Sequence, residues 1–226
     1  MDFEQFALWY ITLIVSLVVH EAAHAWVAYL GGDMTAYVGG QVTLNPIPHM
    51  RREPFGTIVL PIAVLILSKG SMCFGFAHTP IDARWAHKHP RRAALMSVAG
   101  PLSNLLIAAI AFSILKSFVS FGLADPTPSM GMFVNPIDDS SWVAPTAKIA
   151  SFFLILNLLL AILNLFPWPP FDGAGVVGGL SRSAERFYAG IRTQVFLQIL
   201  GLLVAWELLD YTLKPVVYFV RDLLNT

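Results

Sequence analysis

Residues 6–30 form an apolar run of twenty-five residues, interrupted only by a few hydroxyl groups and by the motif HEAAH at residues 20–24. A helix of about 20 apolar residues is long enough to cross the hydrocarbon core of a bilayer. Further apolar runs lie at 93–119, 146–166 and 195–209, and a shorter run of thirteen residues lies at 55–67. This pattern predicts an all-α polytopic membrane protein, a helix bundle of four to six membrane segments.

The charge content agrees with this prediction. Charged residues make up 12% of the 226-residue chain and hydrophobic residues 56%. Ordinary soluble domains are about 25% charged, so we expect the lipid bilayer to cover much of the surface. The net charge is zero, which gives no indication of a nucleic-acid partner. The chain starts MDFE, acidic where a signal peptide would be basic, so we expect the first apolar run to remain as a membrane helix.

The segments between the apolar runs predict a single domain, residues 1–226, with one small β element. Residues 34–44 follow the first span, and their loose alternation of Thr, Tyr and Val predicts a short β-hairpin or sheet edge. The length of the run at 55–67 suits a re-entrant or interfacial segment better than a full crossing, so we expect residues 55–76 to enter the membrane and leave on the same side. Residues 211–226 are amphipathic and are expected to lie at the membrane interface.

Lys and Arg are concentrated in three loops, 51–53, 84–92 and 182–192, whereas the loop 120–146 leans acidic. Loops on the cytoplasmic side of a membrane carry an excess of Lys and Arg. We therefore expect a multi-pass protein of the cell membrane whose three basic loops face the cytoplasm. The loop 120–146 would then face outward.

The HEAAH motif carries the strongest chemical signal. His20 and His24 are one helical turn apart, so both imidazoles project from one face of the first helix and can bind one Zn²⁺. Glu21, between them, can act on water at the metal as a general base. Three ionisable groups within five residues of an apolar span are too costly to serve only as helix contacts. Ala22 is eight residues before Leu30, which puts the predicted site about 12 Å below the cytoplasmic end of the helix, inside the bilayer.

A catalytic zinc ion usually has three protein ligands and one water, so the two histidines leave one ligand to be found. Asp172 lies between the proline-rich stretch NLFPWPPF at 164–171 and the small residues at 173–175. The prolines stop the preceding helix, and irregular backbone at membrane depth is tolerated only where it faces protein or a wet cavity. Asp172 is therefore the predicted third ligand. The alternative is a carboxylate that only caps a helix.

A stripe of small residues lies on the helix predicted for 93–119. Gly100, Asn104 and Ala108 are spaced four apart, which is typical of close packing between membrane helices. Asn104 could also support a metal ligand through a hydrogen bond.

Taken together, the motifs HEAAH at 20–24, AGPLSN at 99–104 and NLFPWPPFDG at 164–173 resemble the site-2 protease family of intramembrane zinc metalloproteases. The pair of motifs TLNP at 43–46 and FGT at 55–57 is similar to the compact prokaryotic branch of that family. The likeness runs over most of the chain.

The resemblance implies roles for individual residues. It makes Asp172 the third zinc ligand and Glu21 the general base, and it suggests that Asn164 holds the substrate strand or stabilises the oxyanion. Ala174 stands where the family usually has a second glycine. We expect the extra methyl group to change local packing more than chemistry.

The expected activity is that of an intramembrane zinc metalloendopeptidase with one Zn²⁺ per chain. Its substrate would be a transmembrane segment of another membrane protein, cut in regulated intramembrane proteolysis. The residues leave a second function open, a non-enzymatic membrane metal transporter or sensor with the same ligands. A transporter usually carries further polar residues along several helices, and this chain has few.

Overall fold

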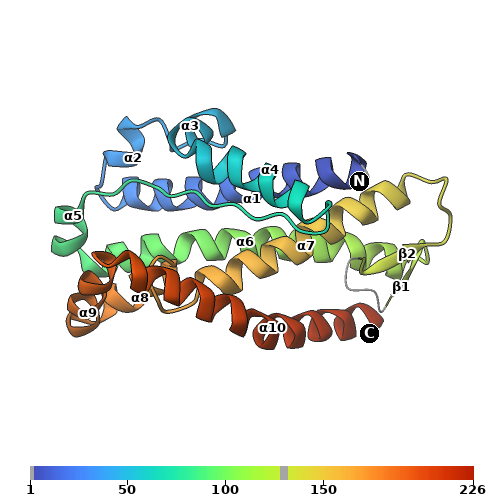
Figure 1. Ribbon diagram of the computed structural model, residues 1–226. Helices are drawn as coiled ribbons and strands as arrows, with labels where there is room; N and C mark the ends of the chain where they lie inside the picture. Colours follow the sequence, from blue (N-terminus) through green and yellow to red (C-terminus); the bar gives the residue numbers. More distant parts are fainter. Residues whose placement is uncertain (1–2, 128–131) are drawn as a thin grey trace.

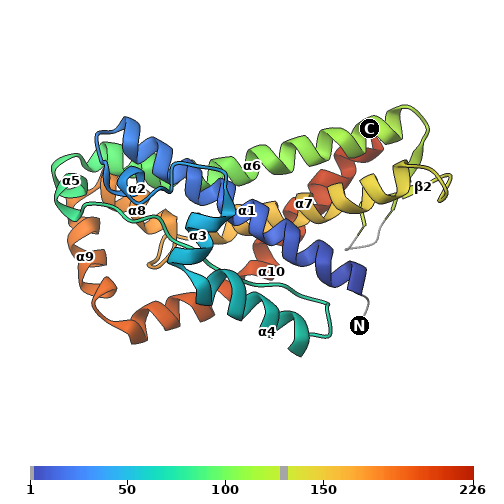
Figure 2. The ribbon, with the colours of Figure 1, turned by 90° about the horizontal axis from the view of Figure 1, so that it is seen from above.

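Four long helices run side by side in the computed structural model, which describes residues 3–127 and 132–226 (Figures 1 and 2). They are α1 Phe3–Leu30, α6 Pro90–Ser120, α7 Val143–Asn164 and α10 Val195–Asn225. All four are long and apolar enough to cross a membrane. The predicted all-α polytopic fold is therefore confirmed, with four candidate spans in the part of the chain that the structure describes.

Short elements lie at the two ends and along one side of this bundle (Figure 1). The short helices are α2 Thr35–Val38, α3 Pro46–Arg52, the π-helix η1 Phe55–Val59, α4 Leu60–Leu67, α5 Ala83–Lys88, α8 Asp172–Leu180 and α9 Arg182–Arg192. Strand β1 Ala124–Pro126 pairs antiparallel with β2 Val134–Pro136. Helices α5, α8 and α9 share one end of the bundle, and the small sheet lies at the other end.

The β-hairpin predicted at residues 34–44 is wrong. Residues 35–38 form the one-turn helix α2, and the two-stranded sheet lies instead between α6 and α7. Asp33 gives the physical reason, because its Oδ1 accepts hydrogen bonds from the backbone N–H and the hydroxyl of Thr35 at 2.9 and 2.6 Å. This local turn competes with an extended strand. Gly40, at φ +71°, follows the helical turn in a conformation that favours glycine.

Residues 55–82 double back along α1. The short helices η1 and α4 point toward the start of α1, and residues 71–82 then run back past α1 to α5 at the opposite end (Figures 1 and 2). The two arms are joined by a hydrogen bond from the N–H of Phe76 to the carbonyl of Gly56 at 3.0 Å. That the segment enters and leaves the membrane on one side stays a prediction.

Helix α10 continues without a break, although the sequence predicted a crossing at 195–209 and a separate interfacial segment at 211–226. Val217 and Leu224 in its second half are fully buried. They belong to a core cluster with Leu115 of α6 and Leu154 of α7. Burying these side chains holds the second half of α10 on the bundle even though Pro215 removes a backbone donor inside the helix.

The centre of the bundle is polar. Nine polar or charged side chains on α1, α6 and α7 are buried there: Thr12, Ser16, His20, Glu21, His24, Ser97, Asn104, Ser151 and Asn157. Buried polar groups are costly unless they are hydrogen-bonded or bind an ion. This layer is therefore the place to look for a functional site.

Candidate metal centre and active site

Helix α1 presents the HEAAH motif to the interior of the bundle. His20, Glu21 and His24 are each no more than 4% exposed. Residues four apart lie on one face of a helix, and the two imidazole rings have their centroids 4.6 Å apart. The apolar sequence of α1 thus forms the helix, and the helix brings the two rings together.

Asp172 approaches α1 because the chain turns sharply between α7 and α8. Three prolines keep residues 165–171 out of a helix. The turn is tied to α9 by the hydroxyl of Tyr188, which donates to the carbonyl of Pro167 at 3.0 Å. Helix α8 then begins at Asp172 itself.

Glycines let α8 pack closely against α6. A Cβ atom at Gly175 would collide with Ser97, and one at Gly179 would collide with Ala94. The close approach of the two helices places Asp172, the first residue of α8, beside the histidines of α1. This is a specific use of glycine, because any larger residue would push α8 outward.

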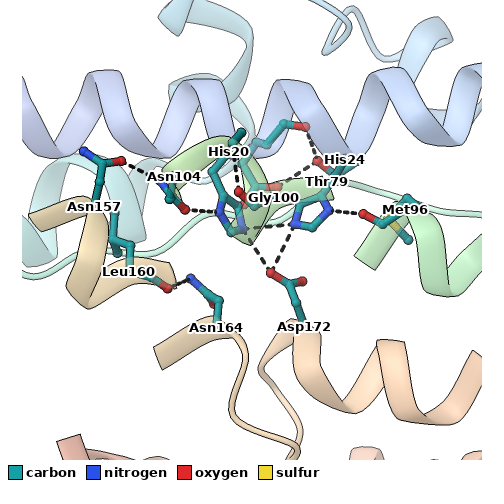
Figure 3. Close-up of polar contacts among 12 residues, drawn as sticks. His20, His24, Thr79, Met96, Gly100, Asn104, Asn157, Leu160, Asn164 and Asp172 are labelled. Carbon is teal, nitrogen blue, oxygen red and sulfur yellow. Dashed lines mark hydrogen bonds and ion pairs between the residues drawn. The ribbon is translucent and has the colours of Figure 1, made fainter. Parts of the chain in front are cut away.

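The side chains of His20, His24 and Asp172 converge on one point (Figure 3). The Nε2 atoms of the two histidines are 3.0 Å apart. Asp172 Oδ2 lies 3.1 Å from Nε2 of His20 and 3.2 Å from Nε2 of His24. In the described part of the chain, this is the one group of three His, Cys, Asp or Glu side chains arranged to hold a metal ion.

The spacing fits a zinc ion. Ligand atoms of a tetrahedral zinc site, at about 2.1 Å from the metal, lie about 3.4 Å from each other. The observed separations of 3.0, 3.1 and 3.2 Å are close to that value. Two imidazoles and one carboxylate are also a ligand set found in zinc hydrolases.

Each histidine also makes a hydrogen bond through its Nδ1 atom, on the side of the ring away from the centre, and these bonds bear on whether Nε2 can bind a metal. Nδ1 of His24 is 2.6 Å from the carbonyl oxygen of Met96. A carbonyl only accepts, so Nδ1 of His24 carries the proton and Nε2 has a lone pair directed at the centre. Nδ1 of His20 is 2.6 Å from Oδ1 of Asn104. Asn104, which the sequence suggested could support a metal ligand, therefore lies against His20.

Glu21 is held beside the centre by a residue from the returning arm of the 55–82 segment. The hydroxyl of Thr79 is 2.7 Å from Oε2 of Glu21 and 2.9 Å from the Glu21 carbonyl oxygen. A hydroxyl has one proton, so it donates to one of the two at a time. The contact fixes the position of the Glu21 carboxylate, and Glu21 lines the same cavity as the three converging side chains.

Gly100 of α6 gives the imidazoles their room. A Cβ atom at this position would collide with Nε2 of His24 and with the ring of His20. The small-residue stripe on α6 therefore does more than allow helix packing, because its first member faces the two histidine rings directly.

A cavity of about 330 Å³ opens onto these side chains. Its lining includes His20, Glu21, His24 and Asp172. Asn164 also lines it, at the end of α7, and its amide donates to the carbonyl of Leu160 at 3.0 Å. The structure thus brings the predicted residues of both distant motifs to one cavity.

Two contributors to the site had no signal in the sequence. Thr79 lies in a stretch that reads as an ordinary polar loop, and only the return of that loop past α1 brings it to Glu21. Met96 acts through its backbone carbonyl, which every residue type has. Ala174, where the family usually has glycine, is 1% exposed, packs with Tyr188 and Ile191 of α9, and also contributes to the lining of the cavity.

The fold and the site define a multi-pass membrane protein of the metalloprotease class. The sequence profile of Peptidase family M50 matches residues 8–206. The chain belongs to this family, the site-2 protease family.

Three relatives agree with the assignment. The "Putative zinc metalloprotease YwhC" of Bacillus subtilis is 36% identical over 209 residues, covering 88% of this chain and 84% of the relative. The "Putative zinc metalloprotease Rip2" of Mycolicibacterium smegmatis is 27% identical over 207 residues, covering 91% of this chain and 70% of the relative. A Mycobacterium tuberculosis protein of the same name is 28% identical over 211 residues, covering 93% and 71%. No solved structure matches the chain.

Proposed function

We propose that the protein is an intramembrane zinc metalloendopeptidase that cleaves transmembrane segments of other membrane proteins. One observation carries the proposal: two histidines and an aspartate converge beside a buried glutamate within a bundle of four candidate spans. A metal transporter would need a polar path through the bundle. In the described parts of the four long helices, the buried ionisable side chains are instead His20, Glu21 and His24, all within five residues of α1.

His20, His24 and Asp172 would hold one Zn²⁺ per chain. When bound, zinc supplies a Lewis acid for the scissile carbonyl and makes water nucleophilic at neutral pH. Three protein ligands is the number found in catalytic zinc sites. His20, His24 and Asp172 would thus be a full set of protein ligands.

Glu21 would take a proton from the attacking water as its oxygen bonds to the peptide carbon. It would return that proton to the nitrogen as the C–N bond breaks. Thr79 would hold the Glu21 carboxylate in place during both transfers. Asn164, on the wall of the cavity, would hold the substrate strand or stabilise the oxyanion.

We also propose that the α5–α9 end of the bundle faces the cytoplasm of a cell membrane. Seven of the fourteen Lys and Arg residues lie in α5, in α9 or in the first turn of α6, which meet at that end: Arg84, Lys88, Arg91, Arg92, Arg182, Arg186 and Arg192. Cytoplasmic loops carry such an excess. The site would lie nearer the cytoplasmic face, because His20 and His24 are in the half of α1 that ends at Leu30.

The test is Glu21→Gln in the purified, full-length protein. We expect the variant to keep its zinc, measured as metal per chain, and to lose cleavage of a model transmembrane substrate by at least about 100-fold. Asp172→Ala should lose both zinc and cleavage, whereas the exposed Asp139→Ala should lose neither. Near wild-type cleavage by Glu21→Gln would refute the mechanism.

A further inference from the structure

We infer that Asn157 of α7 is a positioning residue that sets the proton location on His20, and that it does so through Asn104. The inference rests on the proposed function for its consequence, zinc binding. Asn157 does not touch the metal centre, and neither the motifs nor the family likeness pointed to it. It lies one hydrogen bond behind Asn104, on a different helix (Figure 3).

A chain of hydrogen bonds crosses three helices to reach the centre. Nδ2 of Asn157 donates to the carbonyl of Phe153 and to Oγ of Ser16, both at 2.9 Å. Nδ2 of Asn104 donates to Oδ1 of Asn157 at 2.7 Å. Oδ1 of Asn104 is 2.6 Å from Nδ1 of His20. Ser16, Asn104 and Asn157 are all 0% exposed, so water cannot replace any of these partners.

The carbonyl of Phe153 gives this chain its direction. The orientation of an asparagine amide is decided by its partners, and a carbonyl can only accept. The side of the Asn157 amide that faces Phe153 must therefore be the NH₂ group, which leaves Oδ1 toward Asn104. The serine hydroxyl donates or accepts equally well, so Ser16 does not decide the direction.

The direction then passes to His20. Because Oδ1 of Asn157 only accepts, Asn104 must present its NH₂ group there and its oxygen to His20. Nδ1 of His20 must consequently carry the proton, and Nε2 keeps a lone pair toward Asp172. Each histidine tautomer is thus decided by a backbone carbonyl. At His24 the carbonyl of Met96 acts directly. At His20 the carbonyl of Phe153 acts through the side-chain amides of Asn157 and Asn104.

Fixing the tautomer of His20 matters because, without a metal, the opposite tautomer could also have all its hydrogen bonds satisfied. If Asn104 were reversed, its NH₂ group would donate to Nδ1 of His20. The proton on Nε2 would then be donated to Asp172, 3.1 Å away. That state would close the site to a cation. The relay disfavours it, because it would place two amide oxygens, of Asn104 and Asn157, face to face.

Two substitutions of Asn157 separate this role from simple helix packing. Asn157→Asp keeps an oxygen that accepts from Asn104 whether its carboxyl is protonated or ionised, and when protonated it can also donate to Phe153. Asn157→Leu has a similar size but removes the acceptor and leaves Asn104 free to reverse. Ser151→Ala is the matched control. Ser151 is also fully buried on α7, and its hydroxyl bonds the N–H of Phe133 outside the relay.

The first measurement is zinc affinity of the full-length protein, by competition with a chelator of known affinity. We expect Asn157→Leu to weaken zinc about tenfold, as is typical for outer partners of metal ligands. Asn157→Asp and Ser151→Ala should stay within about threefold of wild type on the same scale. The relay would be overturned if Asn157→Asp and Asn157→Leu lost the same zinc affinity, or if Asn157→Leu lost none.

The second measurement reads the proton directly in zinc-free protein. ¹⁵N spectra of histidine-labelled protein, in solution alkaline enough for neutral imidazoles, should show His20 protonated on Nδ1 in wild type and Asn157→Asp. Asn157→Leu should shift His20 toward the Nε2–H form, while His24 stays unchanged in all three. If wild type fails to bind zinc, the proposed function falls. The tautomer of His20 would still decide whether the relay exists.

Discussion

The hydroxyl of Thr79 and the carboxylate of Glu21 are 2.7 Å apart although 58 residues separate them in the sequence. The contact exists because residues 71–82 run back along α1 after the short helix α4. It joins the buried glutamate of the HEAAH motif to the segment that doubles back along α1. A segment that reads as a connecting loop thereby helps to build the site.

Thr79→Val tests this contact, because valine has the shape of threonine without the hydroxyl. The carboxylate of Glu21 would lose its donor and its fixed direction, so we expect the cleavage rate to fall about tenfold, part of what a general base contributes. Zinc content should not change. Thr79→Ser, which keeps the hydroxyl, should restore most of the rate. A Thr79→Val enzyme with wild-type turnover would show that Glu21 is positioned without Thr79.

Gly100→Ala is expected to act on the metal rather than on the base. The new methyl group would collide with Nε2 of His24 and the ring of His20, so zinc affinity should fall by at least about tenfold. Gly190→Ala on α9 is the control, since a Cβ atom there meets nothing within 4 Å. That substitution should leave zinc binding unchanged. Chelator competition on both variants makes the comparison, and equal affinities would contradict it.

The sequence predicted the features that depend on composition and local pattern. Long apolar runs with few charges form α1, α6, α7 and the first half of α10, because lipid and bundle packing both favour them. The HEAAH spacing and the Pro-rich stretch before Asp172 pointed to residues that the structure brings together. These signals are local, so a single sequence can carry them.

The features it missed depend on which segments meet. At residues 34–44 the alternation of Thr, Tyr and Val suggested strands, but the side chain of Asp33 directs a helical turn there. Asn157 gave no signal within the apolar run of α7, because its role depends on hydrogen bonds with Asn104 and with the Phe153 carbonyl. These partners can be identified only once the positions of the helices in space are known.

Asp33 should contribute to the acid sensitivity of folding. Burial raises the pKa of its carboxyl, but hydrogen bonds from Thr35 and from the N–H of Asp82 at 2.8 Å lower it, and the net pKa is below the usual 3.8. A lowered folded-state pKa gives stability that is present above the unfolded-state pKa and lost as the pH falls through the folded-state pKa. The free energy of unfolding should therefore drop on acidification below about pH 4.

Asp33→Asn removes that dependence. The variant should be less stable at neutral pH by about 1–3 kcal/mol, because an amide NH₂ would face the N–H of Asp82. Its stability should also change less between about pH 4 and pH 2. Unfolding of the detergent-solubilised protein at several pH values measures both effects. Asp139→Asn, at an exposed position, is the control. If the free energy of unfolding fell equally on acidification in both variants, the role of Asp33 would be ruled out.

The last prediction concerns the path of residues 55–82 in the membrane. Because this segment doubles back, positions before and after it should lie on one side of the bilayer. Arg52, Arg91 and Asp139 are all exposed, so a cysteine at each can be reached by reagent. The native Cys73 would first be replaced by serine.

With a membrane-impermeant maleimide on intact cells, Asp139→Cys should label, whereas Arg52→Cys and Arg91→Cys should label only after permeabilisation. Labelling of 52 and 91 from opposite sides would make the segment a true crossing. Labelling of both from outside would keep the re-entrant path but reverse the orientation, placing the metal centre nearer the outer face.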